Sequence, residues 1–341
     1  MKKIRKIIIT LTAMVTASAV ATAGDTSDAY QFLNIPTSSH VYGLGGNNIA
    51  IIDDDVTLAD QNPALIGPEL EKQVAVNYMY YMGTGNFAGL RYGMAADEHS
   101  GWAIGPRYLN YGSFDGYDEF GTPTGSFTPS DLVVEGTYAR DIAGRWRGGV
   151  NLKMAYSNYE NYNAFAIAVD LGVNYYDEEH DLSFSVVLKN MGGQVKRFDK
   201  EYNRLPFDIQ IGYMQSIGHS PFQISITANN LTRWNIPYYA YNKEDEGERF
   251  EEKKGFFSNF FRHLIFGLQY QPSEKFYVDL AYNYKTRSDM TNFNQSFLSG
   301  FSIGAGFRTR GFSVGAAYGQ PHKSASTVMV NLSCSIGELM R

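Results

Sequence analysis

The chain has 341 residues and combines low charge with abundant aromatic side chains and glycine. Charged residues make up 19% and aromatic residues 15%, and there are 34 glycines, a composition more typical of β-proteins than of helical ones. The net charge of -6 at pH 7 argues against a nucleic-acid-binding surface. The single cysteine, Cys334, can form neither an internal disulfide nor a thiolate metal cluster.

The N-terminus has the organisation of a secretory signal peptide. Basic residues among the first six precede an apolar run from Ile7 to Val20, and Ala21 and Ala23 then form an A-x-A pattern. The alternative is a membrane-spanning helix, but threonines interrupt the run and it falls short of the ~20 residues that a bilayer core requires. We therefore expect residues 1–23 to be removed, with cleavage after Ala23.

The segment that follows, residues 24–72, lacks regular alternation, and we expect it to form an N-terminal plug or hatch. Its motif residues are Gly43, Gly45, Gly46, Asp53, Asp54, Asp55, Asn62 and Pro63. The GLGG stretch is too short for a dinucleotide-binding loop and predicts a tight bend instead. The three aspartates could bind Ca²⁺, but they lack the spacing of a calcium loop, so helix-capping or solvated turn roles are favoured.

The rest of the chain alternates between apolar or aromatic residues and polar or small ones. Val328, Val330 and Leu332, for example, would share one face of a strand, with Met329 on the other. Fourteen strands are predicted, near residues 73–82, 86–96, 100–110, 131–141, 146–157, 163–176, 181–190, 206–216, 221–230, 261–271, 275–286, 299–308, 311–319 and 327–337. Within the third, Pro106 cannot donate a ladder hydrogen bond, so we expect a bulge there.

The predicted connections between the strands fall into two classes. Connections such as 97–100 and 142–145 are short, whereas 111–130 and 231–260 are much longer. Short turns at one end and long loops at the other are typical of bacterial outer-membrane barrels. Hydrocarbon offers no hydrogen-bond partners, so an exported chain without apolar helices can span lipid only by closing its sheet. Residues 73–341 are therefore predicted to form an all-β, 14-stranded antiparallel transmembrane barrel, with a soluble β-sandwich as the alternative.

Two stretches before the first strand carry a family resemblance. The sequence GLGGNNIAIIDDD, followed by NPALI, resembles the N-terminal signature of the PorV/PorQ branch of FadL-like outer-membrane proteins in Bacteroidetes. The preceding FLNIPTSSHVYGLGG and the chain length favour the PorQ members of that branch. The resemblance implies a 14-stranded barrel with an N-terminal segment in its lumen.

The same resemblance implies a role in the type IX secretion system. PorQ-like proteins belong to its attachment complex with PorU, PorV and PorZ, and are understood to hold PorZ at the cell surface. That complex attaches cargo to lipopolysaccharide, and PorU performs the chemistry. A PorQ-like chain would therefore be a non-enzymatic scaffold, whereas a PorV-like chain would be a cargo-binding shuttle.

If the aromatic face of each strand meets lipid, charged residues fall on the inner face. They include Arg91, Glu135, Lys153, Asp170, Asp279 and Arg308, together with Arg107, Lys189, Asp208 and Lys285. Their mixed signs argue against a selective ion pore. We expect opposite charges to pair into ladders that plug the barrel, and a transport pathway is the alternative.

Two long predicted loops place aromatic side chains outside the membrane. The candidate partner-binding residues are Phe114, Tyr117 and Phe120 in the first loop and Trp234, Tyr238, Tyr239 and Tyr241 in the second. Exposed aromatic residues are enriched in protein interfaces. The alternative is that they extend the aromatic girdle or fold over the barrel mouth.

No catalytic constellation is predicted. The six histidines include no i, i+4 pair, and no nucleophile elbow occurs, so we expect neither a metal nor a cofactor nor an enzymatic activity. The main hypothesis is a surface scaffold in the outer membrane of a Gram-negative Bacteroidetes bacterium. The alternatives are a FadL-like channel for small hydrophobic molecules and an exported soluble β-protein.

Overall fold

A computed structural model of the chain describes residues 29–70, 72–118, 120–199, 202–242, 247–252, 255–289, 297–322 and 325–339. The expected signal peptide, including Ala23, lies outside the described residues. Among the described residues, no helix is both long and apolar enough to cross a membrane.

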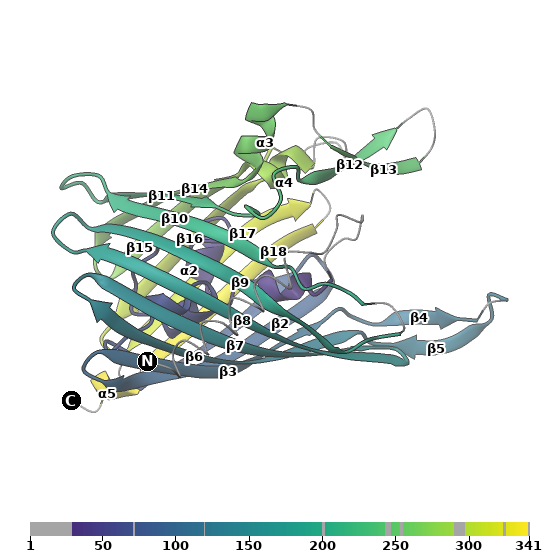
Figure 1. The fold of residues 1–341 in the computed structure, drawn as a ribbon, viewed down its shortest axis with the longest axis horizontal. Coiled ribbons are helices and arrows are strands. Elements are labelled where there is room, and N and C mark those ends of the chain that lie inside the picture. The colour runs from purple at the N-terminus through teal and green to yellow at the C-terminus, as the bar shows by residue number, and fades with distance from the viewer. Residues whose placement is uncertain are drawn as a thin grey trace, which may run out of the picture.

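Fourteen strands form one closed antiparallel barrel (Figure 1), in which β1 and β18 pair to close the ring. The strands are β1 (Gln73–Tyr81), β2 (Gly85–Asp97), β3 (Ser100–Asn110), β6 (Ser130–Ala143), β7 (Trp146–Tyr159), β8 (Tyr162–Asp177), β9 (Leu182–Lys196), β10 (Asp208–Ser216), β11 (Phe222–Ala228), β14 (Leu264–Ser273), β15 (Phe276–Asn283), β16 (Phe301–Thr309), β17 (Phe312–His322) and β18 (Ala325–Ser335). Neighbours in sequence are neighbours in the ring throughout. The predicted architecture, an all-β antiparallel barrel of 14 strands preceded by an N-terminal segment, is confirmed.

The side chains of each strand alternate between an apolar outer face and a polar inner face. On β1, Val76 and Tyr78 are exposed on the outside, whereas Asn77 is buried inside. This arrangement inverts that of a water-soluble protein, and it suits a barrel surrounded by hydrocarbon.

The prediction of a β-bulge at Pro106 is wrong. Pairing between β2 and β3 keeps one register from Asn86↔Asn110 to Ala95↔Gly101 and shifts only beyond Ala95. Gly105 explains this regularity, because a Cβ there would lie 1.9 Å from the carbonyl oxygen of Leu90. The absent side chain lets the two backbones stay close while Pro106 forgoes its hydrogen bond.

The two ends of the barrel differ. One end, here called the turn end, carries the short turns and α5 (Ile336–Leu339); the other, the loop end, carries longer connections (Figure 1). The loop-end elements are the hairpin β4 (Phe114–Tyr117) with β5 (Pro123–Phe127), the hairpin β12 (Pro237–Asn242) with β13 (Gly247–Glu252), α3 (Phe256–Arg262) and α4 (Tyr284–Asp289). Strand length also varies around the ring, from 16 residues in β8 to 7 in β11.

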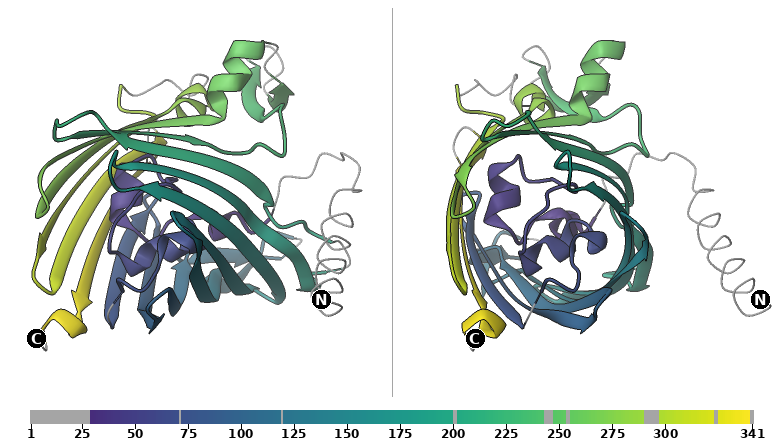
Figure 2. Two further views of the ribbon diagram at one scale, coloured as in Figure 1. Left: turned by 60° about the vertical axis from the view of Figure 1, so that its left-hand side comes forward. Right: turned by 90° about the vertical axis from the view of Figure 1, so that its left-hand side faces the viewer.

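The N-terminal segment occupies the lumen. Residues 29–70, here called the plug, lie inside the ring of strands (Figure 2). They form the 3₁₀ helices η1 (Gln31–Asn34), η2 (Val56–Asp60) and η3 (Pro63–Leu65) and the α-helix α2 (Ser39–Gly43). Apolar plug residues such as Val41, Leu44 and Leu58 are fully buried and pack together and against Met214 of β10, so the plug and the wall share a small apolar core.

Candidate functional site between the plug and the barrel wall

Polar caps fold the plug into short helical turns. Ser38, Asp55 and Asn62 cap α2, η2 and η3, each accepting a hydrogen bond from a backbone N–H two or three residues further on. Pro63 occupies the first turn of η3, where its missing N–H costs no hydrogen bond. Among the predicted plug residues, Asp55 and Asn62 therefore act as helix caps.

The glycines of the GLGG stretch have two different roles. Gly45 and Gly46 adopt φ angles of 97° and 81°, in the left-handed region that favours glycine, and they turn the chain after α2. Gly43 instead lies against the barrel wall, where an added Cβ would approach the Cα of Gly304 to 2.8 Å. The stretch thus bends the plug and also lets α2 approach the strands closely.

Buried charges attach the plug to the wall formed by the long strands. The guanidinium of Arg107, on β3, donates to the backbone carbonyls of Leu33 and Ile35 at 3.1 and 2.9 Å. Glu135, on β6, pairs with Arg107 at 2.7 Å and also with Arg91. All three charged side chains are buried, so this network holds the plug through desolvated ion pairs and hydrogen bonds.

A second polar chain runs beside the first. The Lys153 ammonium is 2.7 Å from Asp170 and donates to Asn190 at 2.9 Å. Asn190 in turn donates to Asn34 of the plug at 2.8 Å. Lys153 and Asp170 are completely buried, and the pair links β7 and β8 to the plug through Asn190.

His40 of α2 makes the charged contact on the opposite wall. Its Nδ1 is 3.0 Å from Asp53, and its Nε2 is 3.1 Å from the side-chain oxygen of Gln269 and 3.5 Å from Asp279. The imidazole stacks on Tyr277, with ring centroids 3.8 Å apart. Because both ring nitrogens face oxygen acceptors, the geometry favours the doubly protonated imidazolium.

The electrostatics of this cluster agree with its geometry. Burial opposes protonation, but the charges and hydrogen bonds of Asp279 and Asp53 outweigh it and raise the pKa of His40 to about 10. Burial likewise opposes ionisation of Asp53, but His40 and Arg308 hold the pKa of its carboxyl well below the usual range. Arg308, half-buried at the turn end, forms an ion pair with Asp53, whereas Asp54 is exposed.

Two cavities lie between the plug and the wall of β14 to β17. The outer cavity, at the loop end, has a volume of about 390 Å³ and is lined by residues that include Ile35, Tyr42 and Phe301. The inner cavity, at the turn end, has a volume of about 200 Å³ and is lined by residues that include His40 and Arg308. His40 and Tyr42 belong to the same helix, so α2 stands between the two cavities.

The part of the barrel wall that faces α2 contains several glycines, so α2 contacts strand backbone there. An added Cβ at Gly315 would lie 2.5 Å from the Oγ of Ser39, and one at Gly319 would lie 3.1 Å from the ring of Tyr42. Together with the contact at Gly304, these glycines form a smooth strip of β16 and β17 against which α2 rests. A shift of α2 along this strip would break the hydrogen bond from the Ser39 N–H to Asn331 and that from the Ser302 hydroxyl to the Gly43 carbonyl, together with the contacts of His40.

The structure separates the two predicted groups of loop aromatics. Phe114 and Tyr117 lie on the β4 strand and Phe120 at the hairpin tip, all exposed. This hairpin joins β3 to β6, nearly opposite β11 and β14 in the ring, where Trp234 lies. Trp234 is exposed and contacts Phe256. The remaining three candidates fall on β12: Tyr238, Tyr239 and Tyr241.

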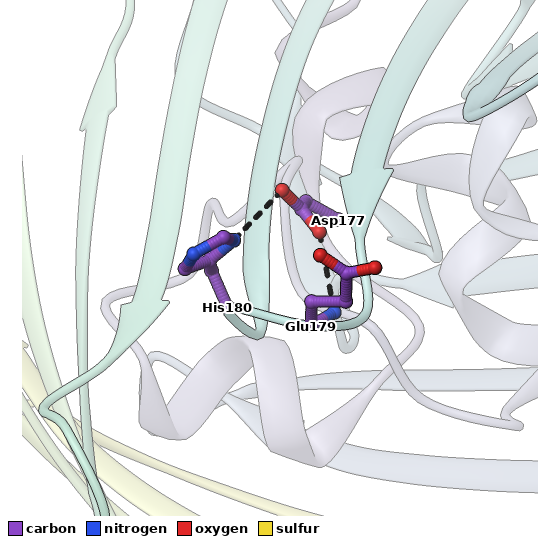
Figure 3. Close-up of side chains that lie close together, drawn as sticks. All are labelled: Asp177, Glu179 and His180. Atoms are coloured by element: carbon purple, nitrogen blue, oxygen red, sulfur yellow. Dashed lines mark hydrogen bonds and ion pairs between the residues drawn. The ribbon is translucent and has the colours of Figure 1, made fainter.

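One cluster of potential metal ligands occurs among the described residues, in the turn between β8 and β9 (Figure 3). His180 Nδ1 is 3.0 Å from Asp177, and Glu179 lies beside them. Arg145 bridges both carboxylates, at 2.5 Å from Asp177 and 3.4 Å from Glu179. Because its guanidinium already pairs with both carboxylates, the arrangement is that of a charged turn.

Sequence reasoning missed His40, Tyr42 and Asn190 as residues that join plug to wall. His40 lies 13 residues from Asp53 but 239 residues from Asp279, so no local pattern connects them. The only available signal was a histidine close to the aspartate triad in a segment expected to enter the lumen.

Comparison with known proteins supports the fold. No protein-family model and no curated protein sequence matches the chain. Its structure is similar to that of the Pseudomonas putida toluene transporter TodX, with a TM-score of 0.53 and 9% identity over 86% of this chain and 95% of TodX. It is equally similar to the monoaromatic hydrocarbon channel CymD, with a TM-score of 0.53 and 12% identity over 88% of this chain and 96% of CymD. This chain is thus a 14-stranded barrel with a plug in its lumen, and its fold resembles that of these two proteins.

Proposed function

We propose that this chain is a non-enzymatic outer-membrane barrel of a Gram-negative bacterium that passes small hydrophobic molecules along its plug. The observation that carries the proposal is the pair of cavities on one wall with α2 between them. The outer cavity has a volume in the range of small-molecule sites and offers Ile35, Tyr42 and Phe301 as apolar contacts. TodX and CymD, which share the fold, are transporters or channels of hydrocarbons.

The geometry suggests how a molecule would move. It would enter the outer cavity from the loop end, and a shift of α2 along the glycine strip would join this cavity to the inner one. The charged networks on the opposite wall would keep the rest of the plug in place. The inner cavity, with His40 and Arg308, is polar and would favour release of an apolar molecule into water.

A binding assay with a cavity-filling variant tests this function. The probe is the fluorescent hydrophobe N-phenyl-1-naphthylamine, added to the purified barrel in detergent. Thr286→Trp places an indole in the outer cavity and is expected to abolish saturable binding, while Thr124→Trp, on the exposed β5 strand, leaves it intact. Equal binding by both variants, or no saturable binding by the wild type, contradicts the proposal.

A second candidate function is a surface scaffold of the type IX secretion system. The observation that favours it is the β4–β5 hairpin, which extends beyond the barrel at the loop end (Figure 1) and exposes Phe114, Tyr117 and Phe120. Such aromatic residues suit the centre of a protein interface. The partner would be a PorZ-like surface protein, with PorU and PorV in the same complex, in a Bacteroidetes outer membrane rich in lipopolysaccharide.

Affinity purification from detergent-solubilised outer membranes separates the two candidates. The tagged wild type should recover a PorZ-like protein and PorU, and replacing Phe114, Tyr117 and Phe120 by serine should remove them. The Thr286→Trp variant should still recover both, since the hairpin is intact. Recovery of the barrel alone contradicts the scaffold and leaves the channel.

A further inference from the structure

Helix α3 has an inverted distribution of polar and apolar side chains. Phe256, Phe257, Phe260 and Phe261 are exposed, with 74% of the Phe257 side chain open to the surroundings. The polar residues Asn259 and Arg262 of the helix are instead buried. A helix on the water-exposed surface of a protein has the opposite arrangement, with apolar residues packed beneath it.

The polar side of α3 is held by specific hydrogen bonds. Asn259 is buried and donates to the side-chain oxygen of Asn235 at 2.8 Å. Arg262 is buried, pairs with Asp289 of α4 at 2.7 Å and donates to a backbone carbonyl. The adjacent His263 is also buried and bonds two backbone carbonyls of the preceding loop. These contacts fix the orientation of α3, so its phenylalanines face outward as a consequence of the fold.

The location of α3 indicates what surrounds these phenylalanines. Viewed along the barrel, α3 lies outside the ring of strands and not over its mouth (Figure 2, right). It directly precedes β14, beside the shortest strand of the barrel, β11. The 7 residues of β11 extend roughly 24 Å, or about 18 Å in height when tilted by ~40°, whereas the apolar band of an outer-membrane barrel is ~25 Å tall. β11 is therefore too short to form the whole band, whereas the 10 residues of β14 reach about 26 Å at the same tilt.

The aromatic surface of α3 continues the outer face of the barrel. The ring of Phe261 contacts that of Phe266, on β14, with centroids 6.5 Å apart. Phe266 belongs to the outward series of that strand, with Leu268 and Tyr270. The apolar surface therefore runs without interruption from the strand onto the helix.

We propose that α3 is embedded in the outer leaflet of the membrane, where its phenylalanines contact lipid acyl chains and complete the apolar band beside β11. The proposal rests on the outer-membrane location that the proposed function includes. Its occupant is lipid because the surface is continuous with the lipid-facing strands and points away from the barrel mouth. The buried hydrogen bonds of Asn259 and Arg262 act as a rigid base for this surface.

Quenching by brominated lipids tests the proposal. The native tryptophans are replaced by Trp102→Phe, Trp146→Phe and Trp234→Phe, and a single probe is introduced as Phe257→Trp. The purified barrel is reconstituted in vesicles of phosphatidylcholine brominated in its acyl chains. We expect a loss of fluorescence comparable to that of a Leu268→Trp probe on the outer face of β14.

Two controls make the outcomes distinguishable. A Phe120→Trp probe, at the tip of the β4–β5 hairpin, is similarly exposed but is expected to remain unquenched. If Leu268→Trp is quenched while Phe257→Trp behaves like Phe120→Trp, the proposal is overturned and a protein partner becomes the occupant of α3. If even Leu268→Trp is unquenched, the barrel is not in the bilayer and the proposed function fails with it. Phe256→Trp provides an independent second probe of the same surface.

Discussion

The plug meets two very different walls. On the side of β3, β6, β7 and β8 the strands are long, and the buried guanidinium of Arg107, which pairs with Glu135, bonds to the plug. On the side of β16 and β17 the contact is made largely by glycine backbone, and the two cavities lie there. One side therefore holds the plug through a network of buried charges. On the other side α2 lies close to glycine backbone, and its directional contacts are those of His40 and neutral hydrogen bonds. These run from the Ser39 N–H to Asn331 at 3.1 Å and from the Ser302 hydroxyl to the Gly43 carbonyl at 2.9 Å.

This difference indicates which part of the plug can move at the lower cost in free energy. A buried ion pair fixes its partners because breaking it leaves a charge without solvent. A glycine surface imposes no such penalty, since sliding exchanges one van der Waals contact for another. We therefore expect movement of α2 against β16 and β17 to be the least costly rearrangement. His40 is the charged residue of α2 that restrains it, and Arg308 of β16 also holds Asp53 of the plug.

The largest expected effect comes from breaking the charged side. Glu135→Gln removes the carboxylate shared by Arg91 and Arg107, and Arg107 then keeps only its pair with Asp60 at 3.6 Å. We expect a loss of about 3–5 kcal/mol in the free energy of unfolding, measured as the urea midpoint in detergent micelles. The control is Asp97→Asn, which breaks the exposed Asp97–Arg140 pair and should cost about 0–1 kcal/mol. Equal losses in both variants would mean that the inner network does not hold the plug.

A smaller effect is expected from the pH dependence of the opposite side. The pKa of His40 is raised from 6.5 to about 10 in the folded protein, so protonation of this group contributes stability fully below about pH 6.5. That contribution is lost as the pH rises through about 10. His40→Gln should lower stability at pH 6.5 by about 1.5–3 kcal/mol, the contribution of hydrogen bonds to a charged group, and should remove the alkaline loss.

Urea midpoints at pH 6.5, 8 and 10 measure this dependence. The matched control is His99→Gln, because the His99 side chain is largely exposed in a turn and should leave the alkaline loss unchanged. If His40→Gln retains the wild-type decline between pH 6.5 and 10, another group is responsible for it. His40 would then not be the titratable group that holds α2 to this wall.

Most of the barrel could be predicted from the sequence because lipid imposes a simple rule on each strand. The third predicted strand, 100–110, coincides with β3, and its alternation arises because every second residue must be apolar. The β4–β5 hairpin was not predicted, because lipid imposes no such rule on a segment outside the membrane. It stands in solvent with nearly all of its residues exposed, so no alternation marks it.

The pairing of the inner charges could not be predicted. Lipid excludes charge from the outer face, so placing Arg91, Glu135 and Asp170 on the inner face required only the strand period. Which of these charged side chains form ion pairs with one another depends on the strand register and on the path of the plug. Arg91 and Glu135 are 44 residues apart, on β2 and β6, and these strands are separated in the ring by β3. The registers of all three strands had to be known before this contact could be predicted.

The last prediction tests the glycine side directly. Gly304→Val places a side chain where a Cβ alone would lie 3.0 Å from the Cα of Gly43 and 3.1 Å from Asp279. Overpacking of this kind costs about 1–3 kcal/mol, and α2 can relieve it by moving away from the wall. We therefore expect a modest loss of stability together with a higher conductance in planar bilayers. Gly136→Val is the control, because an added Cβ there meets no neighbouring atom. A destabilised barrel with unchanged conductance would show that α2 is not the partition between the two cavities, and that the two walls hold the plug with similar firmness.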